Sequence, residues 1–142
     1  MNISELRISV CAVAGAIGST IVHLLGGWSN DITTLIIFMA IDFVMGLAVA
    51  GVFKKSDKSA TGALDSRAGW KGLCKKCAAL FFIIIAHRLD LLLGSDYIRT
   101  TVIIGFIVNE TISIIENAGI MGLPLPKTIT KAVEILKEKS DE

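Results

Sequence analysis

Long apolar stretches alternate with short polar connections along most of this 142-residue chain. A helix of roughly 20 mostly apolar residues is needed to cross the hydrocarbon core of a bilayer. Each stretch that has or approaches this length is predicted to be a transmembrane helix, and the stretches are residues 8–27, 32–53, 74–94 and 97–118. The pattern therefore predicts an all-α integral membrane protein whose transmembrane domain, residues 1–122, is a bundle of about four helices, followed by a tail over residues 123–142.

The first stretch is the weakest of the four, because glycine, serine, threonine and His23 dilute its apolar content. Its small residues recur four positions apart, as Cys11, Gly15 and Ser19 do, which is how membrane helices allow close approach. A helix lying in the membrane interface and a cleaved signal peptide are the alternatives, although cleavage would leave too short an apolar core. The bundle has three spans if residues 8–27 do not cross.

A break separates the last predicted span from the tail, because glycine and proline prevent the helix from continuing. The break residues are Gly122, Pro124 and Pro126. From Thr128 onward the spacing predicts a short amphipathic helix with mixed charge on one side. Its apolar side consists of Ile129, Val133 and Leu136.

Lysine and arginine are concentrated between the second and third predicted spans. The basic residues of this predicted loop, residues 54–73, and of its border are Lys54, Lys55, Lys58, Arg67, Lys71, Lys75 and Lys76. The short connections at 28–31 and 94–96 contain no basic residue. The positive-inside rule therefore places the basic loop and the C-terminal helix in the cytoplasm, and with four spans the N-terminus as well. The loop could also contact anionic lipid.

Composition agrees with a membrane protein, since the mean hydropathy is +0.69 and 53% of the residues are hydrophobic. A net charge of +1 gives no indication of a nucleic-acid partner. The three cysteines, Cys11, Cys74 and Cys77, are interpreted as reduced thiols, because Cys74 and Cys77 form half of a zinc motif without a second pair. No catalytic motif is present, so the sequence predicts no enzyme, no metal site and no cofactor.

Several predicted spans contain polar or charged residues that lipid would penalise. In the second span Asp42 shares a stripe with Gly46 and Ala50, a spacing that favours close helix packing. In the last span the polar and small positions fall within an arc of roughly 140°. The candidate site residues are Asp42, Gly46, His87, Asp90, Gly105, Asn109, Glu110, Ser113, Glu116 and Asn117.

These residues allow three interpretations. One chain could pair them internally, for example Asp42 with His87 and Asp90 with Arg88. The polar faces could instead meet between copies in an oligomer, or line water where several copies surround a pore. Relay of protons through the carboxylates is the third interpretation.

Particular segments resemble the toxin-secretion and phage-lysis holin family, the TcdE-like group of clostridia and of phages of Gram-positive bacteria. The resemblance covers residues 41–132. It rests on "IDFVMG", on "SATGALDSRAGWKG" leading into "KKCAALFFIIIAHRLD", and above all on "NETISIIENAGIMGLPLPKTI".

This resemblance implies a small protein of the bacterial cytoplasmic membrane without enzymatic activity. Its partners would be further copies of itself and the bilayer, and its oligomeric lesions would release an endolysin or a large protein toxin without binding that cargo stably. A small ion or proton channel, a transporter subunit and a non-conducting membrane scaffold are the alternatives.

Overall fold

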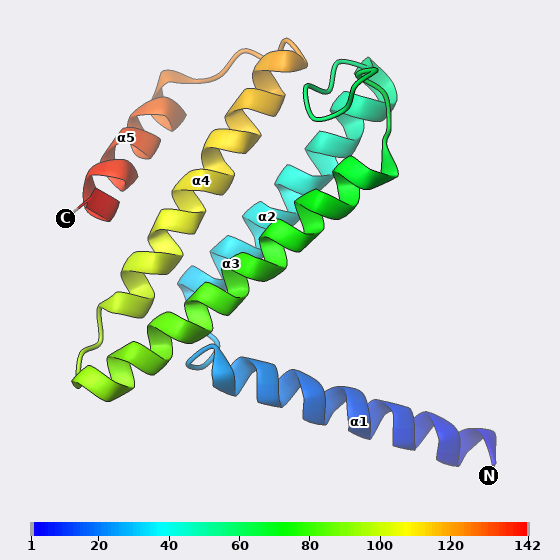
Figure 1. Ribbon diagram of the computed structural model, residues 1–142, viewed down its shortest axis with the longest axis vertical. Helices are drawn as coiled ribbons and strands as arrows, with labels where there is room; N and C mark the ends of the chain where they lie inside the picture. Colours follow the sequence, from blue (N-terminus) through cyan, green and yellow to red (C-terminus); the bar gives the residue numbers. More distant parts are fainter. Residues whose placement is uncertain (1, 142) are drawn as a thin grey trace.

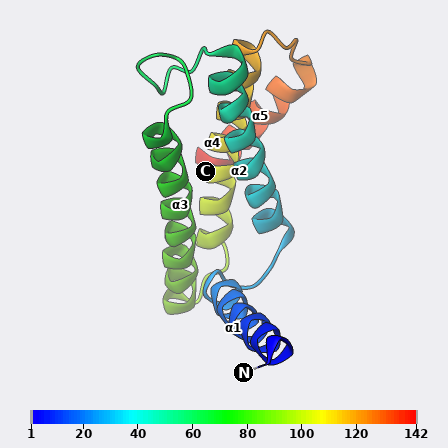
Figure 2. The ribbon, with the colours of Figure 1, turned by 90° about the vertical axis from the view of Figure 1, so that its right-hand side faces the viewer.

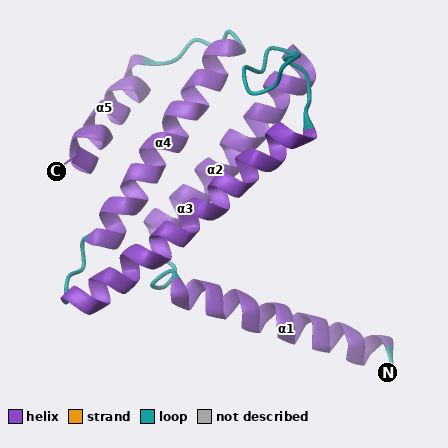
Figure 3. Ribbon diagram, in the orientation of Figure 1, coloured by secondary structure: helices purple, strands orange, loops and turns teal. Residues whose placement is uncertain are grey.

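The computed structural model describes residues 2–141, and the regular secondary structure within these residues is entirely helical. The helices are α1 (Ile3–Leu24), α2 (Asn30–Ala48), a π-helical extension η1 (Val49–Phe53), α3 (Ser66–Leu93), α4 (Ile98–Ile120) and α5 (Lys127–Asp141). The predicted all-α class is therefore confirmed (Figure 3).

Helices α2, α3 and α4 form the bundle (Figure 1). Helices α2 and α4 run in the same direction and α3 runs opposite to both (Figures 1 and 2). Helix α5 turns back along α4, whereas α1 projects away from the end of the bundle opposite the 54–65 loop. Nearly all described residues of α1 are exposed.

The apolar core of the bundle lies in the half that is nearer to α1. Ile32, Leu35, Ile83 and Ile103 are completely buried there and come from three different helices. Around them pack further members of the same cluster: Leu25, Met39, Ala79 and Ile107. The opposite half of the bundle, near the loop, contains the charged residues instead.

Within residues 2–141, three helices are long and apolar enough to cross a membrane: Ile3–Leu24, Asn30–Phe53 and Ile98–Ile120. The weakest predicted stretch is thus among them, as a helix that begins at Ile3 rather than at residue 8. Helix α3 is not, because Lys76 lies at one end of its apolar part and Arg88 and Asp90 near the other. That residues 74–94 cross the membrane stays a prediction.

The basic loop is shorter than the sequence predicted. Asp65 accepts a hydrogen bond from the Arg67 backbone N–H at 2.9 Å and so caps α3, which begins at Ser66. Four basic residues assigned to the loop or its border therefore lie on a helix: Arg67, Lys71, Lys75 and Lys76.

The break before the tail occurs where it was predicted. Gly122 adopts a φ of +77°, and the backbone N–H of Leu123 bonds to the carbonyl of Ala118, which ends α4. Helix α5 follows, with Val133 buried and Ile129 partly exposed. The side chain of Leu136, the third residue predicted for this face, lies outside the described residues.

Two isoleucines of α3 test the bundle packing, since Ile83 is fully buried and Ile85 is 51% exposed. Ile83→Ala is expected to lower the free energy of unfolding by about 2–5 kcal/mol, because it leaves a cavity between three helices. Ile85→Ala is the matched control and should have little effect. Thermal unfolding of both variants in detergent measures this difference, and equal losses would contradict the packing described.

Candidate functional site

One lysine joins the three helices of the bundle. Lys76 on α3 places its Nζ 2.8 Å from Oδ2 of Asp42 on α2 and also forms an ion pair with Glu110 on α4. Asn117 of α4 donates a hydrogen bond of 3.1 Å to the other carboxylate oxygen of Asp42. These four residues, Asp42, Lys76, Glu110 and Asn117, are called the charged cluster below.

The depth of the charged cluster follows from the helix positions of its acids. Asp42 lies twelve residues after Asn30, the first residue of α2, and Glu110 lies twelve residues after Ile98, the first residue of α4. Twelve residues of helix rise about 18 Å. Because α2 and α4 run side by side in the same direction, their two carboxylates reach the same level. In helices that span a bilayer, this level would lie well inside a hydrocarbon core of about 30 Å.

The electrostatic balance of the cluster is uneven. Two carboxylates share one ammonium group, and the side chains of all three residues are at most 13% exposed. Buried charges of this kind are stabilised only while they remain paired and hydrogen-bonded. With both acids ionised the cluster has a net charge of −1, which makes it sensitive to how much water reaches it.

Two hollows lead to the cluster from the end of the bundle that contains the loop. A polar hollow of about 400 Å³ lies between α3 and α4. A smaller, mostly apolar hollow of about 80 Å³ lies under the loop. Both are lined by Asp42, Lys58, Gly72 and Lys76. The apolar core closes the other half of the bundle.

The polar arc predicted on α4 is divided between two environments. Glu110 and Asn117 are buried within the bundle, whereas Asn109 and Glu116 are exposed and line the polar hollow. Ser113 and Gly105 are half-buried. Thus only part of the predicted polar face is satisfied by the chain's own helices, and Asn109 and Glu116 form an outward polar strip.

Within the chain Asp42 pairs with Lys76 and not with His87, the partner named as an example of internal pairing. A lysine side chain at the start of the apolar part of α3 is long enough to reach inward. Gly46 does not mediate close packing, since a Cβ added there would meet nothing within 4 Å. Gly46 instead lines the apolar hollow under the loop.

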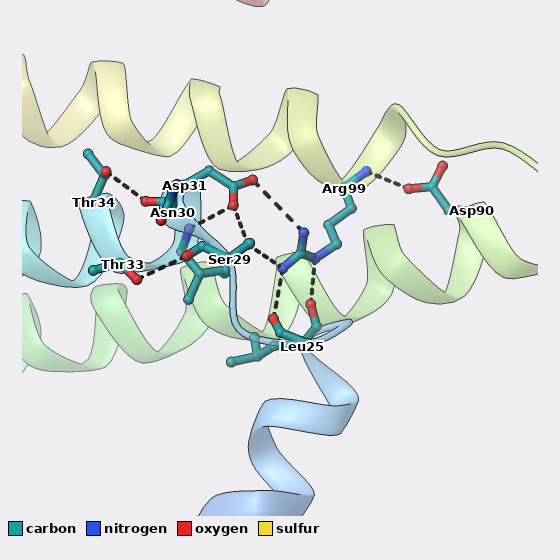
Figure 4. A network of polar contacts seen from close by, with 10 residues as sticks. Leu25, Ser29, Asn30, Asp31, Thr33, Thr34, Asp90 and Arg99 are labelled. Carbon is teal, nitrogen blue, oxygen red and sulfur yellow. Dashed lines mark hydrogen bonds and ion pairs between the residues drawn. The ribbon is translucent and has the colours of Figure 1, made fainter.

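A second polar cluster lies at the opposite end of the bundle (Figure 4). Arg99 donates to the carbonyls of Leu25 at 2.5 Å and Gly27 at 3.1 Å, and to the hydroxyl of Ser29 at 3.1 Å. Its guanidinium is also 3.9 Å from Asp31. Arg99 therefore fixes the connection between α1 and α2 against the beginning of α4.

Asp90 caps α4 and does not pair with Arg88, the partner named as an example of internal pairing. Its carboxylate accepts hydrogen bonds from the backbone N–H groups of Ile98 and Arg99 at 3.1 and 2.8 Å, and from Ser95 at 2.6 Å. Orphan N–H groups at a helix start are good carboxylate partners, whereas Arg88 is exposed. His87 is half-buried, and a Cβ at Gly26 would lie 2.7 Å from its Nδ1.

Sequence reasoning missed Arg99 and the inward role of Lys76. A signal for Arg99 was present in the sequence, because an arginine in the first turn of an apolar stretch needs hydrogen-bond acceptors nearby. Within the described residues no group of His, Cys, Asp and Glu could hold a metal ion. Cys11, Cys74 and Cys77 are free and exposed.

The sequence is similar to a known protein family and to several relatives. The model of the bacteriophage holin family matches residues 19–138. An uncharacterized protein of Halalkalibacterium halodurans is 36% identical over 130 residues, which cover 87% of this chain and 90% of the relative. An uncharacterized protein of Listeria monocytogenes is 34% identical over 126 residues, which cover 88% of this chain and 84% of the relative.

A more distant relative has a functional name. The protein named probable holin of Bacillus phage phi105 is 26% identical over 109 residues, which cover 76% of this chain and 75% of the relative. No solved structure matches the chain.

The charged cluster predicts a specific order of stabilities. Lys76→Met should lower the free energy of unfolding by about 3–5 kcal/mol, because it leaves two buried carboxylates without a cation. Adding Asp42→Asn and Glu110→Gln to Lys76→Met should recover most of this loss. Lys75→Met, at the exposed neighbouring position, is the control. Unfolding in detergent gives the order, and a triple variant no more stable than Lys76→Met would contradict it.

Proposed function

The chain belongs to the bacteriophage holin family, and we propose that copies of it assemble in the bacterial cytoplasmic membrane into lesions through which an endolysin or a large protein toxin leaves the cytoplasm. It is a membrane protein with apolar helices of spanning length.

The observation that carries this proposal is that only some of the polar side chains of α4 have partners within the bundle. Glu110 is paired within the bundle, but Asn109 and Glu116 face outward on a helix that is long enough to span. Both residues line the polar hollow between α3 and α4, and wherever this hollow borders lipid the strip is unfavourable. Contact with another copy, or with water in a lesion, would satisfy it, so the strip favours assembly.

The charged cluster supplies a reason for a threshold. In a single chain the ion pairs with Lys76 hold α2, α3 and α4 together. When enough copies surround a polar region, water entering through the hollow would hydrate the same carboxylates and offset the loss of their pairing. Release of these pairs would then become favourable only in the assembly.

We propose an orientation with the 54–65 loop and α5 on the cytoplasmic side. The loop and the adjoining start of α3 contain the basic residues that the positive-inside rule places in the cytoplasm. The polar hollow would then open toward the cytoplasm.

The competing function is an ion channel of fixed size. The hollow lined by Asp42 and Glu110 favours it, because it leads toward two intramembrane carboxylates. Against it, the packed core around Ile83 and Ile103 closes the other half of the bundle, so a single chain provides no continuous path.

Expression in bacteria that also contain a cytoplasmic endolysin lacking a secretion signal tests the proposal. Abrupt lysis that requires both proteins, with simultaneous loss of membrane potential, is expected, as followed by culture turbidity and a potential-sensitive dye. Depolarisation without enzyme release would favour the channel, and no effect on either would favour a scaffold.

The carboxylates should set the timing of this lysis. Asp42→Leu and Glu110→Leu are each expected to shift the onset of lysis at least two-fold or to abolish lysis, because each removes a charge that is paired in the single chain. Asp96→Leu, in an exposed connection, is the control at matched membrane accumulation. Unchanged onset in both cluster variants would refute a role for these acids.

A further inference from the structure

Helix α5 packs along α4 beside the half of α4 that is nearer the loop end of the bundle (Figures 1 and 2). It buries Val133, which is 8% exposed. The opposite side of α5 is a charged face of exposed residues at helical spacing. These residues are Lys127, Lys131, Glu134 and Glu138.

The packing of α5 conflicts with a lipid environment around α4. Helix α4 has spanning length, so a helix folded back along it lies beside hydrocarbon. The ion pairs among the described side chains involve Asp31, Asp42, Lys76, Arg99 and Glu110, and none involves α5. Charged side chains next to lipid tails are strongly unfavourable, so this side of α4 and α5 requires water.

We propose that α5 packs along α4 only where that side of α4 faces water, so that the charged face of α5 forms part of the wall of the lesion. This inference rests on the proposed function. Before assembly α5 is separated from α4 and lies outside the hydrocarbon. Once the lesion has formed, α5 packs against α4 through the apolar residue Val133.

The connection between the helices suits such a movement. Gly122 at a φ of +77° ends α4, and the prolines Pro124 and Pro126 prevent a continuous helix. Helix α5 begins directly afterwards, at Lys127, and can therefore move as one element about residues 121–126.

A pair of matched substitutions in α5 tests the contact. Val133→Asp places a carboxylate in the buried position, whereas Ile135→Asp makes the same kind of change at a position that is 57% exposed. Val133→Asp is expected to delay endolysin release at least three-fold or to abolish it, and Ile135→Asp to leave it near that of the unchanged protein. Equal release times for the two variants, at equal membrane accumulation, would overturn the inference.

The position of α5 can be measured directly in the full chain. Spin labels at Ile112→Cys on α4 and Glu138→Cys on α5, with the three native cysteines replaced by serine, report their separation in lipid vesicles that contain a large labelled dextran. At low protein density, with dextran retained, a long separation is expected. At high density, with dextran released, a short separation is expected.

The possible outcomes separate the inference from the function on which it rests. Dextran release without any change in separation, or a short separation while dextran is retained, would overturn the inference alone. Failure to release dextran at every density would refute the proposed function and the inference with it.

Discussion

The ion pairs that Lys76 makes with Asp42 and Glu110 are the constraint on which the rest of the bundle depends. A carboxylate on α2 and another on α4 can share one ammonium only if both lie at the same level and α3 crosses close to them. The parallel course of α2 and α4 meets the first condition, and the long side chain of Lys76 meets the second. A charge requirement thus fixes how three apolar helices are placed, which apolar packing against lipid specifies poorly.

The opposite end of the bundle is fixed by a second polar cluster. Arg99 binds the carbonyls at the α1–α2 connection and Asp90 caps α4, so four helices are joined within a few residues. Between the two clusters lies the apolar core around Ile83 and Ile103. The bundle is consequently held firmly at the Arg99 end, whereas its loop end contains hollows and is held by the charged cluster. Opening at the loop end therefore requires fewer apolar contacts to be lost.

The sequence predicted the helices, the break at Gly122 and the polar arc of α4, because these follow from local periodicity and from backbone chemistry. It did not predict the partner of Asp42. Lys76 stands in a basic run at the edge of an apolar stretch, and such lysines usually extend toward the interface. Only the tertiary arrangement shows that this one points inward. Likewise, periodicity could group Asn109 with Glu110 but could not show that the bundle buries one and exposes the other.

The polar side chains of α4 fall into two groups, one paired within the bundle and one without partners there, and these two groups have opposite effects on assembly. Paired charges inside the bundle oppose its opening in a single chain, while the outward residues Asn109 and Glu116 favour contact with further copies or with water. In the assembly that we propose, each added copy would cover such a strip and enlarge the region where water, rather than lipid, borders the helices. More water would then reach the carboxylates of the charged cluster, so both effects would favour further assembly. Such an assembly would change abruptly at a critical number of copies, because each added copy would favour the next.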